Sequence, residues 1–320
     1  MHPETTRRAG GLHRALPVGA ALILIALAVA MTAEAQDLEP RAYANTPVGI
    51  NFLVLGYVYT HGDVAFDASA PIKDAELTVH TAYLAYARSL DLWGHAGKLE
   101  AGKLEAVLPW SELKGTAKVF DQPRDREVSG LGDPRLRLSV LLYGGPALTM
   151  EEYAHHESDL IIGAGLAVSL PLGQYETRNL VNLGTNRWSF RPEIGISKAL
   201  GPFTLELIPS VTFYTDNRDF FRSTTLHVDP LYAVQGHVIY LTRFGLWVAL
   251  DATYYAGGRR SINGKEGERL EKVRAGGTIA IPVDRHNSIK LYGSTGAVGR
   301  ADGSFDAIGI AWQYRWGGGI

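Results

Sequence analysis

The sequence predicts an all-β protein, a transmembrane antiparallel up-and-down β-barrel of about 12 strands, and three observations lead to this prediction. First, the stretch from Asp306 to Trp316 alternates an apolar file that ends in aromatic residues with a file of small or polar ones. Second, stretches with the same alternation recur along the chain, and strand side chains alternate between two faces. Third, short connections alternate with long ones, as in outer-membrane barrels, whose lipid-facing strands also carry aromatic girdles.

The chain begins with a segment typical of export signals. Three arginines lie near the start, residues 15–31 carry no charge, and Ala33 and Ala35 form a small-x-small cleavage site. The alternative is an N-terminal membrane anchor, but the uncharged run is rich in alanine and short for a spanning helix. We therefore expect residues 1–35 to be a cleaved signal peptide and residues 36–320 to form the barrel.

The composition after this segment also fits a barrel. No later segment approaches the ~18 uncharged apolar residues of a membrane helix, and only helices and closed barrels satisfy their backbones in lipid. The chain holds 36 glycines, 15 tyrosines and 6 tryptophans, and its net charge of −2 argues against a nucleic-acid partner. Cysteine is absent, which excludes disulfides and thiolate chemistry. A soluble β-sandwich or propeller is the competing fold, and the alternating loop lengths favour the barrel.

The expected strands lie at residues 50–59, 76–89, 103–110, 131–143, 160–170, 188–198, 203–214, 228–241, 246–255, 271–281, 288–298 and 306–316. Each is close to the ~10 residues that a tilted strand needs to cross a bilayer, and an even count leaves both termini on one side. The sequence Ala-Gly-Lys-Leu-Glu repeats at residues 96–105 with an odd period. We therefore expect the first copy in a turn and the second in the third strand.

The connections alternate from the sixth strand onward. They are short at residues 201–202, 242–245 and 284–287, and longer at residues 215–225, 257–270 and 299–305. Short turns of outer-membrane barrels face the periplasm, which places Trp316 in the periplasmic girdle. Residues 144–158 are the exception, because this connection is long where a short turn is expected.

The inward files of the expected strands carry most of the charge. An Arg or Lys facing lipid near the midplane would cost ~2–4 kcal/mol, so charged residues are expected to line the lumen. The expected lumen-lining residues are Glu76, His80, Arg88, Asp133, Arg135, Arg137, Arg191, Glu193, Glu206, Asp229, His237, Asp251, Lys272, Arg274, Lys290 and Arg315. They form either a polar conduit with a solute path or structural ion pairs that fill a narrow barrel.

Metal binding and catalysis are weakly indicated. One connection contains acidic and histidine residues of the kinds that bind metals: Glu151, Glu152, His155, His156 and Asp159. Adjacent histidines on a loop rarely point the same way and no third-ligand spacing recurs, so a solvated polar turn is favoured over a metal site. A barrel lipase or protease would use His80 or His237 with Ser197 or Ser210, but Gly-x-Ser-x-Gly is missing. Glycines at residues 163–165 and 276–277 lack phosphate-loop spacing and indicate strand curvature or lumen space. We expect no catalytic site, metal or cofactor.

Several motifs together resemble one known family. They are Arg41–Phe52, Gly130–Pro134, Asn182–Phe190, Asp229–Tyr232, Tyr254–Gly258 and Ala311–Trp316. With these motifs the chain resembles the outer-membrane transporter family named for the meta-pathway of phenol degradation, over nearly its whole mature length. The Gly317–Ile320 tail and the tandem at residues 96–105 depart from the pattern.

The resemblance implies uptake of aromatic or other hydrophobic compounds. Because the sequence holds no ATP motif or energy-coupling helix, we expect a channel in the outer membrane that passively admits small hydrophobic or aromatic compounds. Its expected partners are the lipid bilayer, such a solute, and the barrel assembly machinery, with Trp312, Tyr314 and Trp316 as the assembly signal. Two alternatives remain: a structural barrel that acts through its outer loops, and an outer-membrane lipase.

Overall fold

The computed structural model describes residues 39–64, 72–92, 101–119, 122–157, 159–179, 181–267, 269–300 and 305–320. The predicted signal peptide and the first copy of the tandem lie outside these ranges. Within them, no helix has the length and apolar character required to span a bilayer.

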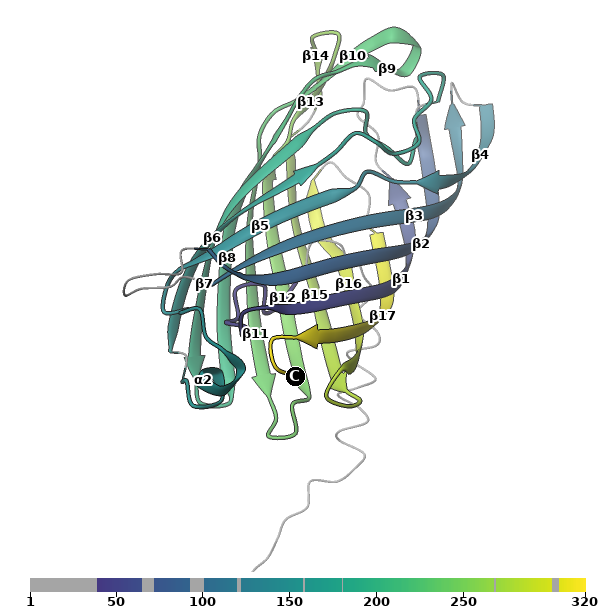
Figure 1. The fold of residues 1–320 in the computed structure, drawn as a ribbon. Helices are drawn as coiled ribbons and strands as arrows, with labels where there is room; N and C mark the ends of the chain where they lie inside the picture. Colours follow the sequence, from purple (N-terminus) through teal and green to yellow (C-terminus); the bar gives the residue numbers. More distant parts are fainter. Residues whose placement is uncertain are drawn as a thin grey trace, which may run out of the picture.

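One antiparallel sheet forms the wall and closes on itself (Figure 1). Its strands are β1 (Ile50–Val64), β2 (Ile72–Asp91), β3 (Ala101–Val119), β4 (Gln122–Leu131), β5 (Arg135–Tyr143), β6 (Leu160–Ser169), β7 (Ser189–Leu200), β8 (Phe203–Tyr214), β11 (Leu231–Leu241), β12 (Trp247–Gly257), β15 (Leu270–Pro282), β16 (Asn287–Arg300) and β17 (Phe305–Gly317). Strands β4 and β5 both pair with β3, at successive stretches, so they occupy one position in the wall. The result is the predicted closed barrel of 12 antiparallel strands.

The two ends of the barrel differ. At one end lie a four-stranded sheet and a 3-10 helix: β9 (Asn217–Phe220), η1 (Phe221–Ser223), β10 (Thr224–Val228), β13 (Arg260–Ile262) and β14 (Lys265–Glu266). The C-terminus, the tight turns and the short helix α2 (Met150–Ala154) lie at the opposite end (Figure 1). Long and short connections are therefore segregated, as the sequence predicts for the later strands.

The final strand has the two faces that its sequence predicts. Ile308 in the apolar file is 61% exposed, whereas Ala307 and Ala311 in the other file are 3% and 1% exposed. The apolar file is exposed on the outside of the barrel, where a lipid bilayer satisfies it, and small residues face the crowded interior. The rings of Trp312, Tyr314 and Trp316 stack in succession at centroid distances of 6.1 and 5.6 Å.

Strand β1 joins the two ends of the sheet and pairs with both β17 and β2. Here Gly56 and Gly309 lie beneath two inward tyrosines, and Tyr83 and Tyr292 share a hydroxyl–hydroxyl hydrogen bond of 3.0 Å. A Cβ on Gly56 would lie 2.0 Å from the Tyr83 ring, and one on Gly309 would lie 2.4 Å from the Tyr292 ring. The absent side chains let both rings lie along the wall.

The long connection after β5 lies among the tight turns. It contains helix α2, which begins with a capping box between Thr149 and Glu152. The backbone N–H of Val48 donates to the carbonyl of Leu148 at 2.8 Å, and Asn45 donates to the carbonyl of Pro146 at 3.2 Å. The connection is therefore long because it holds the segment that precedes β1.

Candidate functional site

The lumen is occupied by the chain itself. Residues 39–49, here called the plug, precede β1 and contact strands far away in sequence. The backbone N–H of Arg41 donates to Oε2 of Glu206 at 2.7 Å, and the hydroxyl of Tyr43 donates to Oε1 of Glu193 at 2.9 Å. These contacts join residues 165 and 150 positions apart.

Tyr43 is the most deeply seated side chain of the plug, with 1% of its surface exposed. Its ring lies against Gly163, Gly165 and Gly195 on the neighbouring strands β6 and β7. A Cβ on Gly195 would come within 2.0 Å of the ring, and one on Gly163 within 2.5 Å. The prediction that glycines at residues 163–165 provide lumen space is therefore confirmed, and the space is a slot for one aromatic ring.

A buried cluster of ion pairs surrounds this slot. Arg137 contacts Glu105 through Nη1 at 3.1 Å and Glu193 through Nη2 at 2.5 Å, and its guanidinium lies 5.4 Å from the centre of the Tyr43 ring. Lys103 pairs with Glu105 at 3.0 Å. Because desolvated charges need partners, this cluster is stable only when its members are matched. The cluster corresponds to the second of the two alternatives that the sequence left open, in which structural ion pairs fill a narrow barrel.

A second polar group lies further around the wall. Nδ1 of His237 is 2.6 Å from Oδ1 of Asp251, and Thr278 donates to Oδ2 of that carboxylate at 3.2 Å. Both members of the His–Asp pair have side chains at most 1% exposed. Within the described part of the chain, Nε2 of His237 has no hydrogen-bond partner. The carboxylate therefore fixes the orientation of a buried imidazole.

Strand pairing places most of the predicted lumen residues on the inward face. These residues are Arg135, Arg137, Arg191, Glu193, Glu206, His237, Asp251, Lys272, Arg274, Lys290 and Arg315. Arg315 lies at the end beside the tight turns, where its Nε donates to the carbonyl of Arg285 at 2.7 Å. It caps a turn at the rim.

The prediction for β2 is wrong, because its two faces are exchanged. His80 pairs in register with Tyr59, which pairs with the exposed Ile308, so Glu76, His80 and Arg88 lie on the outward face. His80 approaches the hydroxyl of Tyr57 at 2.6 Å. Both faces of this strand carry apolar residues, so alternation alone misassigns the polar ones.

Two further residues that were predicted to line the lumen instead bind residues of the connecting loops. Asp133 follows β4 and accepts from the backbone N–H of Gly173 at 2.9 Å and from the hydroxyl of Thr185 at 2.6 Å. Asp229 precedes β11 and lies 3.6 Å from both His227 and Arg259. Each carboxylate fixes connections at the long-loop end.

The candidate metal and catalytic residues do not come together. Among the residues that the structure describes, no group of three or more His, Cys, Asp or Glu side chains could hold a metal ion. Glu152 caps α2, and Asp159 pairs with Lys198 at 2.5 Å. In the strand pairing Ser197 lies next to Glu206, which separates it from His237. Ser197 and His237 therefore do not pair.

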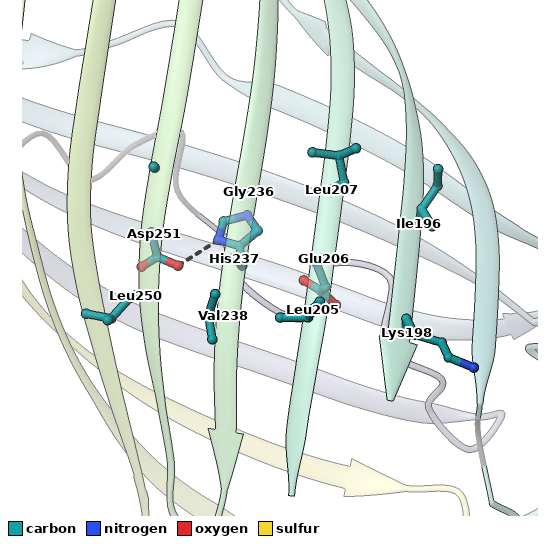
Figure 2. A pocket seen from close by; sticks show the side chains of 11 residues that line it. Ile196, Lys198, Leu205, Glu206, Leu207, Gly236, His237, Val238, Leu250 and Asp251 are labelled. Atoms are coloured by element: carbon teal, nitrogen blue, oxygen red, sulfur yellow. Dashed lines mark hydrogen bonds and ion pairs between the residues drawn. The ribbon is translucent and has the colours of Figure 1, made fainter. Parts of the chain in front are cut away.

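The outer wall carries a shallow hollow of about 570 Å³ over β7, β8, β11 and β12 (Figure 2). Leu205, Leu207, Val238 and Leu250 line it and belong to the exposed outward files, with Gly236 among them. The His237–Asp251 hydrogen bond marks the same level of the wall (Figure 2). The hollow is a depression in the lipid-facing surface.

Sequence reasoning missed four members of the lumen site: Tyr43, Lys103, Glu105 and also Glu39, whose Oε2 lies 3.5 Å from Nη1 of Arg137. Lys103 and Glu105 lie two residues apart in the second copy of the tandem, so the alternation could have placed both on one face. Tyr43 lies in an aperiodic stretch before the first strand, and its only sequence signal is its place in the Arg41–Phe52 motif.

Known structures share this architecture. An outer membrane channel from Pseudomonas putida F1 is similar with a TM-score of 0.74 at 20% identity, over 88% of this chain and 100% of that one. The transport unit of the autotransporter AIDA-I from Escherichia coli gives a TM-score of 0.49 at 10% identity, over 92% and 97%. The β-domain of the Bordetella autotransporter Brka gives 0.46 at 9% identity, over 84% and 100%. At these identities the first likeness shows the fold.

Among curated proteins, no sequence matches this chain significantly. The model of one protein family, described as "Putative MetA-pathway of phenol degradation", matches residues 60–313, which is more than half of the chain. The resemblance seen in the sequence motifs is thereby confirmed. The chain belongs to this phenol-degradation family of outer-membrane-type barrels.

Proposed function

We propose that the protein is an outer-membrane channel that passively admits small hydrophobic or aromatic compounds. The observation that carries this proposal is a closed barrel whose lumen holds a segment that belongs to no wall strand and that contacts inward carboxylates of β8 and β7 through Arg41 and Tyr43. Because residues 39–49 take no part in the strand pairing of the wall, their displacement would break these contacts and keep the barrel closed. The family description and the name of the Pseudomonas putida channel support the same function.

The proposal includes export and orientation. Residues 1–35 would be removed as a signal peptide, the tight turns and both termini of the mature chain would face the periplasm, and Trp312, Tyr314 and Trp316 would be the assembly signal. The mature protein should begin at Gln36 when its N-terminus is sequenced. Trp316→Ala should reduce the amount inserted in the outer membrane, and unchanged membrane yields would contradict that role.

Transport is tested with purified protein in liposomes. Uptake of a neutral aromatic such as toluene or phenol should exceed that of protein-free liposomes, and Tyr43→Ala should raise both uptake and ion conductance. A shift in gel migration on boiling serves as the control for a folded barrel. A folded protein that carries no aromatic compound and no ions, with or without Tyr43, would overturn the proposal.

A barrel that acts through its outer loops is the second candidate. The four-stranded sheet of β9, β10, β13 and β14 favours it, because this sheet gives the long-loop end a defined surface. The same liposome experiment distinguishes the two, since a loop-acting barrel predicts no flux from either the wild type or Tyr43→Ala.

A further inference from the structure

We propose that the slot filled by Tyr43 is a binding site for neutral phenols, and that Tyr43 occupies it as an internal substitute for such a solute. This inference rests on the proposed function and deepens it, because it names the class of solute. Three observations carry it: the shape of the slot, the group that meets the hydroxyl, and the attachment of the plug.

The slot has the shape of one aromatic ring. Gly163 and Gly195 face each other in the pairing of β6 with β7, and a Cβ on either would overlap ring carbons of Tyr43. A Cβ on Gly165 would lie 2.6 Å from the hydroxyl oxygen. The wall therefore lacks side chains along the full length of the ring, from its first carbon to its oxygen.

The far end of the slot selects a hydroxyl. Glu193, whose side chain is 4% exposed, accepts from the Tyr43 hydroxyl at 2.9 Å and is held by Arg137. A carboxylate accepts hydrogen bonds and cannot donate them, so it favours a phenol over toluene. It repels a benzoate at the same position. The Arg137 guanidinium near the ring adds a cation–π contact.

The entrance of the slot sets the substitution pattern. The Cβ of a tyrosine leaves its ring opposite the hydroxyl, so a phenol in this position would direct its para substituent to the lumen. Tyr43 is attached to a plug that is anchored near β1, where Ser89 donates to the carbonyl of Pro47 at 2.6 Å. Withdrawal of Tyr43 would therefore also open the contact of Arg41 with Glu206, while the contact at Pro47 stays in place.

Binding is measured by calorimetry on purified Tyr43→Ala in detergent. The probe is 4-methylphenol, which is the tyrosine side chain itself, compared with toluene and 4-methylbenzoate. Because a hydrogen bond to a charged group contributes ~1.5–3 kcal/mol, 4-methylphenol should bind about ten-fold or more tightly than toluene. Wild-type protein should bind it more weakly, since Tyr43 competes. Equal binding of 4-methylphenol and toluene would overturn the inference.

Two glycine variants provide a matched pair in the Tyr43→Ala background. Gly195→Ala places a methyl group inside the slot and should abolish 4-methylphenol binding, whereas Gly236→Ala adds one on the outer wall, 4.0 Å from its nearest neighbour, and should leave it unchanged. If Gly195→Ala fails to fold, Gly163→Ala tests the opposite strand. Binding that survives both slot variants would contradict the assignment. A phenol site in a barrel without flux would overturn the proposed transport alone.

Discussion

Two places in the lumen set a tyrosine ring over glycine, and they differ in what holds the ring. At the β1–β17 junction, Tyr83 and Tyr292 cover Gly56 and Gly309 and bond to each other. At β6 and β7, Tyr43 covers glycines of two strands from within the lumen. It lies on the plug and not on a wall strand, and it donates a hydrogen bond to a carboxylate. The first pair belongs to the wall, whereas the second ring belongs to a separate segment.

The difference shows how one packing device can serve two purposes. Tyr83 and Tyr292 belong to wall strands, so their rings stay within the wall, and their packing and shared hydrogen bond stabilise the barrel. Tyr43 can leave with the plug, and its departure uncovers a buried acceptor in a ring-shaped slot. The Tyr43 site contains a charged residue, Glu193, which pairs with Arg137. The junction of Tyr83 and Tyr292 is joined by a hydrogen bond between neutral hydroxyls.

The largest expected effect is on the charged site. Arg137→Ala would leave Glu105 and Glu193 buried without their shared partner, and breaking a buried ion pair costs ~3–5 kcal/mol. The free energy of urea-induced unfolding in phospholipid vesicles should fall by about that amount. Tyr83→Phe, assayed in parallel, should lose much less. Comparable losses in the two variants would show that the sites do not differ in this way.

Removing single hydroxyls compares the two tyrosine sites directly. Tyr43→Phe loses a hydrogen bond to a charged group, at ~1.5–3 kcal/mol, and Tyr83→Phe loses a neutral one, at ~0.5–1.5 kcal/mol. The same unfolding experiment should therefore rank Tyr43→Phe as the more damaging change. The reverse order would mean that the Glu193 contact contributes little in the assembled barrel.

Adding a methyl group should separate stability from conductance. Gly309→Ala forces Tyr292 off the wall and should cost ~1–3 kcal/mol, as overpacking does, without opening the lumen. Gly195→Ala displaces Tyr43 and should raise single-channel conductance in planar bilayers. A conductance increase in Gly309→Ala, or none in Gly195→Ala, would remove the distinction between a fixed and a releasable ring.

The smallest expected effect is a change of conductance with pH, which acts through the loop that holds the plug. The backbone N–H of Thr149 lowers the pKa of Glu152 below its usual range. A depressed carboxyl pKa gives stability that is present above the unfolded value of ~4.3 and is lost as the pH falls through the folded value. Conductance should therefore rise slightly below about pH 4, because α2 and the loop that holds the plug loosen. Glu152→Gln should remove that pH dependence.

The last strand shows how far sequence alone could go. Its alternation assigned Ile308 outward and Ala307 inward correctly, because the outward residues of this strand are large and apolar and the inward ones are small or polar. The same rule failed on β2, where Tyr83 faces inward over Gly56 and His80 faces outward. Because both faces of β2 carry apolar residues, a two-residue period in hydrophobicity cannot tell its inward face from its outward face.

The candidate site was predicted in part. Arg137, Glu193 and Glu206 were assigned to the lumen because charge avoids lipid. Tyr43 was not, because its partners lie about 100 or more positions along the chain and no local pattern records them. Contacts of that range are set by closure of the barrel, which brings β6 and β7 opposite the segment before β1.

The length of the plug determines how a free solute would compete with it. Seven positions separate Tyr43 from Ile50, the first residue of β1. If the contacts at Asn45 and Val48 also open, a flexible tether this short would hold its end group near the slot at an effective concentration of the order of millimolar. Under the proposed exchange, an external phenol must approach that concentration to displace the ring, and the lumen would then stay closed when solute is scarce.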